Sequence, residues 1–259
     1  MSKVVQMPAA RRINRGKGHS YTLDGQPVMG VTTAIKKGLP MPALSGWAAR
    51  ECAEFVAGRR DILTQLNDAE LMDLVKGAPN RVRNQAAERG TEVHSLAQRL
   101  ARGDEVEVPE ELNGHIDHYL AFLDAFRPAR AIVERPVFNR RFRYGGTLDM
   151  LAETPDMGWT LFDVKTSGSG IYGDIALQLA AYGHAEFYVD EDNAEVPLPD
   201  VDSYVAVWVR GDGYDVYPVD VTEREWIVFQ SVLQVAWWAE QRQEQVVGAA
   251  IWRREEVKS

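Results

Sequence analysis

Two acids and a lysine carry the chemistry that this sequence predicts. Asp163 and Lys165 are two residues apart in the apolar stretch 159–165, which has the composition of a buried strand, so their side chains point to the same side. Asp149 lies in a second strand-like stretch, 147–153. A hairpin centred on residue 156 joins the two stretches and places Asp149 opposite Asp163.

This arrangement favours metal-assisted hydrolysis of a phosphodiester. Directly opposed carboxylates on neighbouring strands repel each other by up to ~1 kcal/mol, and a divalent cation between them removes that cost. The metal activates a water and neutralises charge on the phosphate, while a lysine positions the water or stabilises the transition state. Asp156, which follows Pro155, falls at the tip of the same hairpin, roughly 23 Å from Asp163. We therefore exclude Asp156 as a ligand.

The elements before Pro128 are predicted to be mostly helical. A hairpin is expected over 21–31, because the turn pair Asp24-Gly25 separates two apolar stretches. Thr32 or Thr33 is expected to cap a short helix that ends near Gly38. Apolar residues at helical spacing predict further helices over 47–58, 62–76, 80–101 and 112–123.

After Pro128 the pattern changes to strands. Strands are expected over 131–137, 142–144, 147–152 and 159–165, followed by a helix over 174–188. An acidic loop, 190–202, leads to strands 203–210 and 214–219, and a capping box, Thr222 to Glu225, begins the last helix. The predicted organisation is a flexible basic arm (1–18), a hairpin and helical region (19–128), an α/β core (129–245) and a tail (246–259).

Composition and charge exclude several classes of protein. The 259 residues carry 29 Lys+Arg against 38 Asp+Glu, a net charge of −9, so a nucleic-acid reader that relies on bulk positive charge is excluded. The single cysteine excludes an intrachain disulfide, a four-cysteine zinc site and an iron–sulfur cluster held by four cysteines of one chain. No stretch has the ~18–20 apolar residues of a membrane span, so we expect no membrane partner and a cytoplasmic location.

Positive charge is nevertheless concentrated locally. Five arginines lie between residues 130 and 143 with Glu134 as the single acid. Arg140, Arg141 and Arg143 are either a phosphate-binding strip or a solvated hairpin face. Glu134 has either a role linked to the metal or an ion pair with an arginine.

Four motifs occur in the order seen in a known family: Glu88–His94, Gly146–Asp149, Asp163–Lys165 and Gln178–Tyr182. Together they resemble RecB-type nucleases of the PD-(D/E)XK superfamily, in particular the phage and bacterial exonucleases, which are similar to the RecB-like nucleases of CRISPR adaptation. The resemblance covers about residues 20–240. It implies an α/β fold with a restriction-endonuclease-like α/β/α core, a mixed central sheet and a helical N-terminal half.

The resemblance also implies roles for individual residues. His94, Asp149 and Asp163 would bind Mg²⁺ or Mn²⁺ together with the main-chain carbonyl of Val164. Lys165 would act in catalysis with the two aspartates. Gln178 and Tyr182 would orient the site or contact the nucleic-acid backbone. The expected activity is hydrolysis of DNA in phage or bacterial recombination or repair, with DNA and a single-strand annealing or recombinase protein as partners.

Three alternatives remain at this point. A nuclease of CRISPR adaptation would share the motifs, although that branch has four iron–sulfur cysteines that this chain lacks. A DNA-end-binding protein with weak or no catalysis is opposed by the intact acids and lysine. A metal hydrolase that acts on another substrate is favoured by the negative charge. His115 and His118, three residues apart, are interpreted as surface residues.

Overall fold

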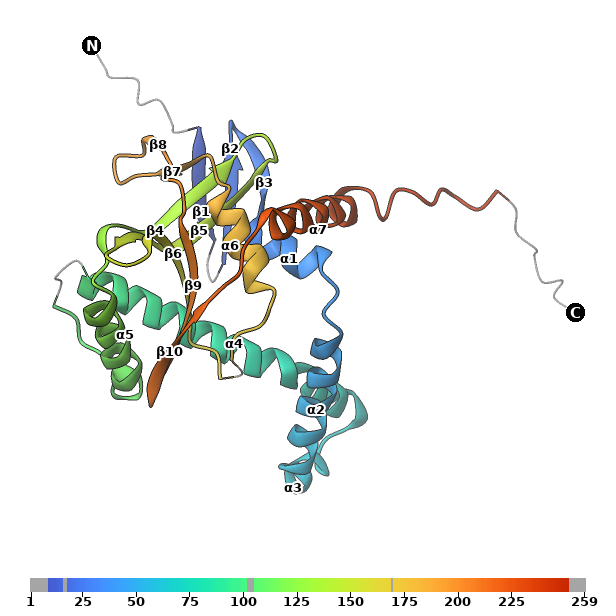
Figure 1. Cartoon of the computed structure of the whole chain (residues 1–259). Helices are drawn as coiled ribbons and strands as arrows, with labels where there is room; N and C mark the ends of the chain where they lie inside the picture. Colours follow the sequence, from blue (N-terminus) through green and yellow to red (C-terminus); the bar gives the residue numbers. More distant parts are fainter. Residues whose placement is uncertain (1–8, 16–17, 102–104, 169, 252–259) are drawn as a thin grey trace, which may run out of the picture.

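The computed structural model describes residues 9–15, 18–101, 105–168 and 170–251, which form a mixed α/β fold (Figure 1). The strands are Ala10–Arg15 (β1), Gly18–Leu23 (β2), Gln26–Gly30 (β3), Ala129–Asn139 (β4), Tyr144–Thr154 (β5), Gly158–Lys165 (β6), Phe187–Val189 (β7), Glu195–Pro197 (β8), Ser203–Arg210 (β9) and Gly213–Pro218 (β10). The helices are Val31–Gly38 (α1), Pro42–Ala57 (α2), Arg60–Leu63 (α3), Asp68–Ala101 (α4), Glu110–Leu112 (η1, a 3₁₀ turn), Asn113–Phe126 (α5), Ile175–Gly183 (α6) and Glu223–Gln241 (α7).

Strand β5 is the centre of the sheet. Antiparallel β4 pairs along one edge of it, while the other edge is shared by two strands. There, β3 pairs in parallel with residues 144 and 145, and β6 pairs antiparallel with residues 150–154. Strand β6 continues in parallel to β9, which makes a hairpin with β10. The sheet is therefore mixed, as the family resemblance implies.

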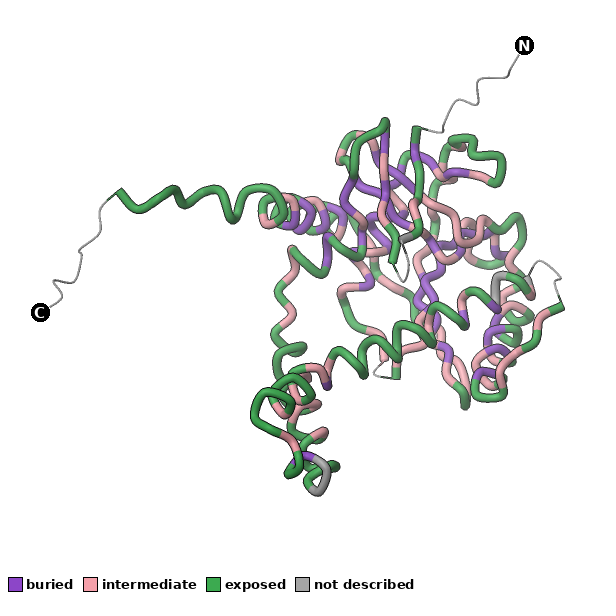
Figure 2. The backbone as a smooth tube through the Cα atoms, turned by 180° about the vertical axis from the view of Figure 1, so that it is seen from behind, coloured by how far each residue is buried: buried purple, intermediate pink, exposed green. Residues whose placement is uncertain are grey.

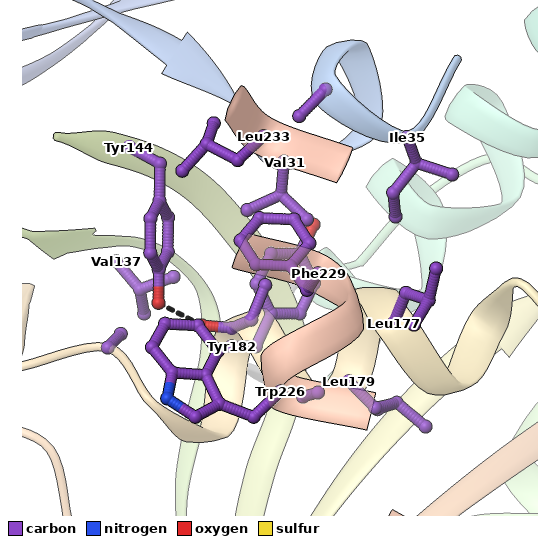
Figure 3. Close-up of a cluster of buried hydrophobic side chains, with 14 of the residues drawn as sticks. Val31, Ile35, Val137, Tyr144, Leu177, Leu179, Tyr182, Trp226, Phe229 and Leu233 are labelled. Carbon is purple, nitrogen blue, oxygen red and sulfur yellow. Dashed lines mark hydrogen bonds between the residues drawn. The ribbon is translucent and has the colours of Figure 1, made fainter. Parts of the chain in front are cut away.

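One face of the sheet carries the main hydrophobic core. Helices α1, α6 and α7 cover this face, and the fully buried Tyr144 packs edge-on against Phe229 (Figure 3). The Tyr144 hydroxyl donates a 2.7 Å hydrogen bond to the main-chain carbonyl of Ala181, which ties β5 to α6. The predicted capping box at Thr222 and Glu225 is confirmed at the start of α7.

The opposite face is covered by α5, whose Tyr119 and Phe122 pack on Met150 and Phe162. The long helix α4 runs beside α5 and then leaves the sheet to meet α2 and α3 (Figure 1). Every residue from 80 to 89 is exposed (Figure 2), and this part of α4 contacts α2 through Arg81, whose guanidinium lies over the ring of Phe55. The described helices include none that is both long and apolar enough to cross a membrane.

The structure corrects the predicted N-terminal organisation. Residues 1–18 were expected to form a flexible arm, but Ala10–Arg15 is a strand that pairs with β2; residues 1–8 and 16–17 lie outside the described part. The hairpin of β2 and β3 is confirmed, and its turn residues Asp24 and Gly25 both have positive φ, as a two-residue turn of this kind requires. Gly30, rather than a threonine, precedes α1.

Two predicted helices are parts of a single one. The ranges 62–76 and 80–101 fall largely within α4, which continues through Pro79. This helix begins at Asp68 because the amide and side chain of Asn67 exchange hydrogen bonds of 3.1 and 3.0 Å with Glu70. The predicted helix 174–188 ends at Gly183, since residues 187 and 188 pair with β4 instead. The predicted strand 142–144 is mostly the turn between β4 and β5.

The predicted boundary at residue 128 does not separate the layers. Strand β3 joins the central sheet, and Val31, Ala34 and Ile35 of α1 lie in the main core. In the predicted tail, residues 246–250 are exposed and outside any helix or strand, and residues 252–259 lie outside the described structure.

Candidate metal centre

The centre lies where β3 and β6, which pair with different parts of the same edge of β5, separate from each other; we call this gap the fork. The β5–β6 ladder follows the predicted register, with Met150 opposite Phe162, but its pairing ends there, one position before Asp149 and Asp163. Because β3 pairs only with residues 144 and 145, residues 146–149 have no neighbouring strand at this edge within the described structure. The fork leaves main-chain groups of β6 available to side chains.

Asp149 occupies this fork. Its Oδ2 accepts a 2.7 Å hydrogen bond from the main-chain N–H of Val164, which holds the carboxylate against β6. His94 reaches the same place from α4. Its Nε2 lies 3.0 Å from the carbonyl oxygen of Val164, and its Nδ1 lies 3.7 Å from Asp149 Oδ1. The structure therefore brings together three of the predicted metal ligands.

Glu134 is a further acid at the same place. Its Oε1 lies 3.1 Å from His94 Nδ1. The β4–β5 pairs on either side, Val133 with Met150 and Arg135 with Leu148, set Glu134 opposite Asp149. Glu134 also has a φ of +51°, a backbone conformation that is costly for a non-glycine residue and is concentrated at functional sites.

The same register arithmetic that paired Asp149 with Asp163 identifies Glu134. Tyr144 follows Asn139 across a short turn, so the β4–β5 hairpin is centred between residues 141 and 142 and sets 134 against 149. The residue pattern alone does not give this pairing, because it predicts strands over 131–137 and 142–144 and so misplaces the ends of the hairpin. Glu134, Asp149 and Asp163 thus form a row of acids on three neighbouring strands, β4, β5 and β6. Among the described residues, the ligand atoms that lie within 4.8 Å of one another come from His94, Glu134 and Asp149, and the predicted ligand Asp163 is not in that group.

The ligand atoms fit a small divalent cation. One atom from each of His94, Glu134 and Asp149 lies within 4.8 Å of the others, and two ligands on opposite sides of a bound ion are separated by about 4–5 Å. These residues line a cavity of about 10 Å³, close to the size that holds one water, with walls of Val93, Tyr119, Val133 and Val164. One imidazole among oxygen donors suits Mn²⁺ as well as Mg²⁺.

Asp163 and Lys165 lie on the side of β6 that faces α6. The Lys165 Nζ is 2.5 Å from the buried Asp163 Oδ2, so the two side chains form an ion pair. Gln178 Nε2 donates to Asp163 Oδ1 at 2.6 Å, and its Oε1 lies 3.5 Å from Lys165 Nζ. Tyr182 follows one turn later, with its hydroxyl 3.4 Å from the same Gln178 nitrogen. Gln178 therefore orients both members of the predicted pair.

Burial and charge set the protonation of the centre. Burial disfavours the charged imidazole of His94, but the attraction of Asp149 and Glu134 outweighs it and raises the pKa of His94 to about 9. Burial raises the pKa of Asp163 to about 6; Lys165 opposes this shift and Asp149 adds to it. Burial also lowers the pKa of Lys165, but the acids around it raise that pKa by more, so the lysine stays charged.

Neither the protein-family models nor the curated proteins give a match to this chain.

Close packing explains two of the four motifs. A Cβ at Gly146 would overlap the ring of Tyr182, so glycine at this position lets α6 lie directly on β5. A Cβ at Gly90 would lie only 3.2 Å from Thr166 Oγ1. The glycine therefore lets α4 pack closely against the end of β6. These contacts set the distance of His94 and Gln178 from the strands.

Other predicted residues lie away from the centre. Arg140, Arg141 and Arg143 are in the β4–β5 turn, roughly 17 Å along β4 from Glu134. Arg140 is ion-paired with Asp24 and Glu195. Asp156 is exposed at the opposite turn, as expected.

His118, predicted to be a surface residue, is only partly exposed. Its Nδ1 lies within 3.2 Å of the carbonyls of Gly114 and Arg210, so the ring is half-buried between α5 and β9. His115 is also half-buried, and its Nδ1 has no hydrogen-bond partner within the described structure.

Proposed function

We propose that this chain is a metal-dependent deoxyribonuclease, an exonuclease of phage or bacterial recombination or repair. The observation that carries the proposal is the row of acids on three neighbouring strands, with His94 at one side and the Lys165–Gln178 pair at the other. The motif order that resembles RecB-type nucleases supports it.

Each side chain has a distinct task in this proposal. His94, Glu134, Asp149 and the Val164 carbonyl would hold Mg²⁺ or Mn²⁺, with Asp163 at the edge of the set. The bound metal supplies activation of a water and neutralisation of charge on the phosphate. Lys165 keeps its proton beside Asp163 and stabilises charge that develops on the phosphate oxygens. Gln178 fixes Lys165 and Asp163 relative to each other.

Local charge supports DNA as the substrate despite the net charge of −9. The exposed part of α4, residues 80–89, carries Arg81, Arg83 and Arg89 against Glu88. Arg81 is held by the Leu74 carbonyl and the Phe55 ring, so Arg83 and Arg89 are the cations that support the proposed substrate. This segment leads directly to His94. A DNA backbone that follows α4 would therefore meet positive charge before it reaches the acids.

The test is digestion of end-labelled DNA, single- and double-stranded, linear and circular, in Mg²⁺, Mn²⁺ or Ca²⁺. We expect cleavage of linear DNA in Mg²⁺ and at least equal cleavage in Mn²⁺, and binding without cleavage in Ca²⁺. Cleavage of circular DNA, which has no ends, would show that the activity is that of an endonuclease and not of an exonuclease. Metal-independent binding to ends without any cleavage would favour the DNA-end-binding alternative.

Asp163→Ala is predicted to abolish cleavage, because it removes the partner of Lys165 and one acid of the row. Asp156→Ala, which changes an exposed aspartate at the hairpin tip, is the matched control and should retain full activity. Initial cleavage rates and circular dichroism of both variants make the comparison. Activity of Asp163→Ala within about tenfold of the parent would contradict the site.

A further inference from the structure

A second, larger cavity adjoins the metal centre. It has a volume of about 550 Å³, within the range of small-molecule sites, and lies between the end of α5 and strands β4 and β5. Tyr119 and Val133 line both this groove and the small cavity at His94, Glu134 and Asp149. A molecule in the groove would therefore reach the metal centre past these two side chains.

The lining of the groove suits a nucleobase. Leu123, Pro128, Val133 and Met150 give it apolar walls, and the ring of Tyr119 stands at its inner end. Every nucleobase has an apolar face that packs on such side chains irrespective of sequence. Ala131 is exposed along the same wall, so the groove stays open on that side.

The rim of the groove carries two arginines and two acids, and one of the arginines suits the backbone that a base carries. Arg135 is ion-paired with Glu191, and Asp124 is also at the rim. Arg127 is exposed and forms no hydrogen bond or ion pair through its side chain with any other described residue. It is thus a cation available for a phosphate at the outer end of the groove.

We infer that this groove binds the nucleoside of the nucleotide whose phosphate lies at the metal centre, with Arg127 beside the next phosphate of the strand. The inference rests on the proposed nuclease function and extends it, because it assigns a subsite for a single unpaired nucleotide. A base inside a duplex is paired and stacked, so the groove takes a nucleotide only from a single strand or a frayed end.

The test measures binding rather than cleavage. The probes are deoxyadenosine 5′-monophosphate and inorganic phosphate, titrated against the full chain in Mn²⁺ by calorimetry. Because a buried base adds an interaction that phosphate lacks, the nucleotide should bind the parent at least about fivefold more tightly than phosphate does. Ala131→Trp fills the groove from an exposed position and should remove this preference. Ala125→Trp, an equal change at an exposed residue of α5 outside the groove, should keep it.

Ala131→Leu is the milder second variant, and should reduce the preference if the tryptophan variant does not fold. Arg127 has a left-handed backbone conformation, which glycine also adopts readily, so Arg127→Gly removes the charge without strain. This variant should weaken binding of a 5′-phosphorylated dinucleotide more than binding of the mononucleotide. Equal binding of nucleotide and phosphate by the parent, or an unchanged preference in the folded Ala131 variants, would overturn the inference.

These outcomes are separate from the failure of the proposed function. If the parent prefers the nucleotide over phosphate but digests no DNA, the groove assignment stands and the nuclease proposal fails. If the parent digests DNA but shows no such preference, the nuclease proposal stands and the groove assignment fails.

Discussion

At the scale of single residues, the centre depends on acids that are close together and cannot all be charged at no cost. Asp149 sits between Glu134 and Asp163 in the row, and burial raises its pKa while the cation of His94 lowers it. The protonated imidazole of His94 and the ammonium of Lys165 offset part of the repulsion from either side. A divalent cation would replace the proton of His94 in this role.

His94 is predicted to make Mn²⁺ binding depend on pH. Its pKa of about 9 means that a bound metal must displace one proton at neutral pH, so the apparent affinity should rise about tenfold per pH unit from pH 7 to about 9 and then level off. His94→Glu removes this proton and should flatten the profile. Calorimetric titration with Mn²⁺ at several pH values makes the comparison, and a flat profile of the parent would remove His94 from the site.

The free energy of unfolding of the metal-free protein should fall as pH rises, whereas the affinity for Mn²⁺ should rise. The folded-state pKa of His94 lies above the ordinary value of 6.5, so its contribution to the free energy of unfolding is fully present below pH 6.5 and is lost as pH rises towards about 9. Chemical denaturation in the presence of a chelator measures this change, and the His94→Glu variant should lack it.

At the scale of elements, the close contact of β5 with α6 positions Asp163 and Lys165, the pair that we propose to be catalytic. Gly146 leaves room for the Tyr182 ring, which is one turn from Gln178, and Gln178 contacts both Asp163 and Lys165. The geometry of the pair therefore depends on a glycine that lies in a different strand.

Gly146→Ala is predicted to lower both stability and activity. The added methyl overlaps the Tyr182 ring, so α6 must move outwards, and overpacking of this kind costs typically 1–3 kcal/mol. Gly46→Ala is the control, because its added methyl meets nothing within 4 Å and alanine favours a helix. Thermal unfolding and cleavage rates test both variants. An unchanged melting temperature of Gly146→Ala would contradict this account of the motif.

At the scale of the whole molecule, the net charge of −9 means that the proposed DNA substrate would have to be held by separate positive segments. The exposed part of α4, residues 80–89, is one such segment. The β4–β5 turn is a second, roughly 17 Å from Glu134, which corresponds to about five base pairs of DNA. In this turn Arg140 is balanced by Asp24 and Glu195, so Arg141 and Arg143 carry the available charge.

Replacing Arg141 and Arg143 by alanine is therefore predicted to change binding only for long DNA. On a duplex that extends well beyond five base pairs from the cleaved bond, the salt dependence of binding should weaken by about 0.9 in log–log slope for each lost phosphate contact. A shorter duplex should show no change. Arg140→Ala is the control and should leave the slope unaltered on both. If the double variant has the same salt-dependence slope as the parent on long DNA, the turn does not contact phosphates and is only a solvated surface.

The sequence by itself determined the features that depend on residues close together in the chain, namely side-chain alternation, hairpin register and helix capping. Alternation within β6 put Asp163 and Lys165 on one side, the hairpin arithmetic gave the β5–β6 register, and the capping box located the start of α7. The strand 203–210 was predicted to the residue. These features follow from local periodicity and turn chemistry, which a short stretch of chain carries in full.

Only the tertiary structure decided what depends on segments far apart in the chain. His94 and Val164 are seventy residues apart in the chain. They meet because α4 packs against the end of β6 at Gly90. The fork that receives Asp149 exists because β3, from the N-terminal part of the chain, and β6 share one edge of β5 without meeting. Such contacts are selected by the packing of whole elements. The motif around His94 implied its role through the family resemblance, since local periodicity does not encode which distant strand a helix meets.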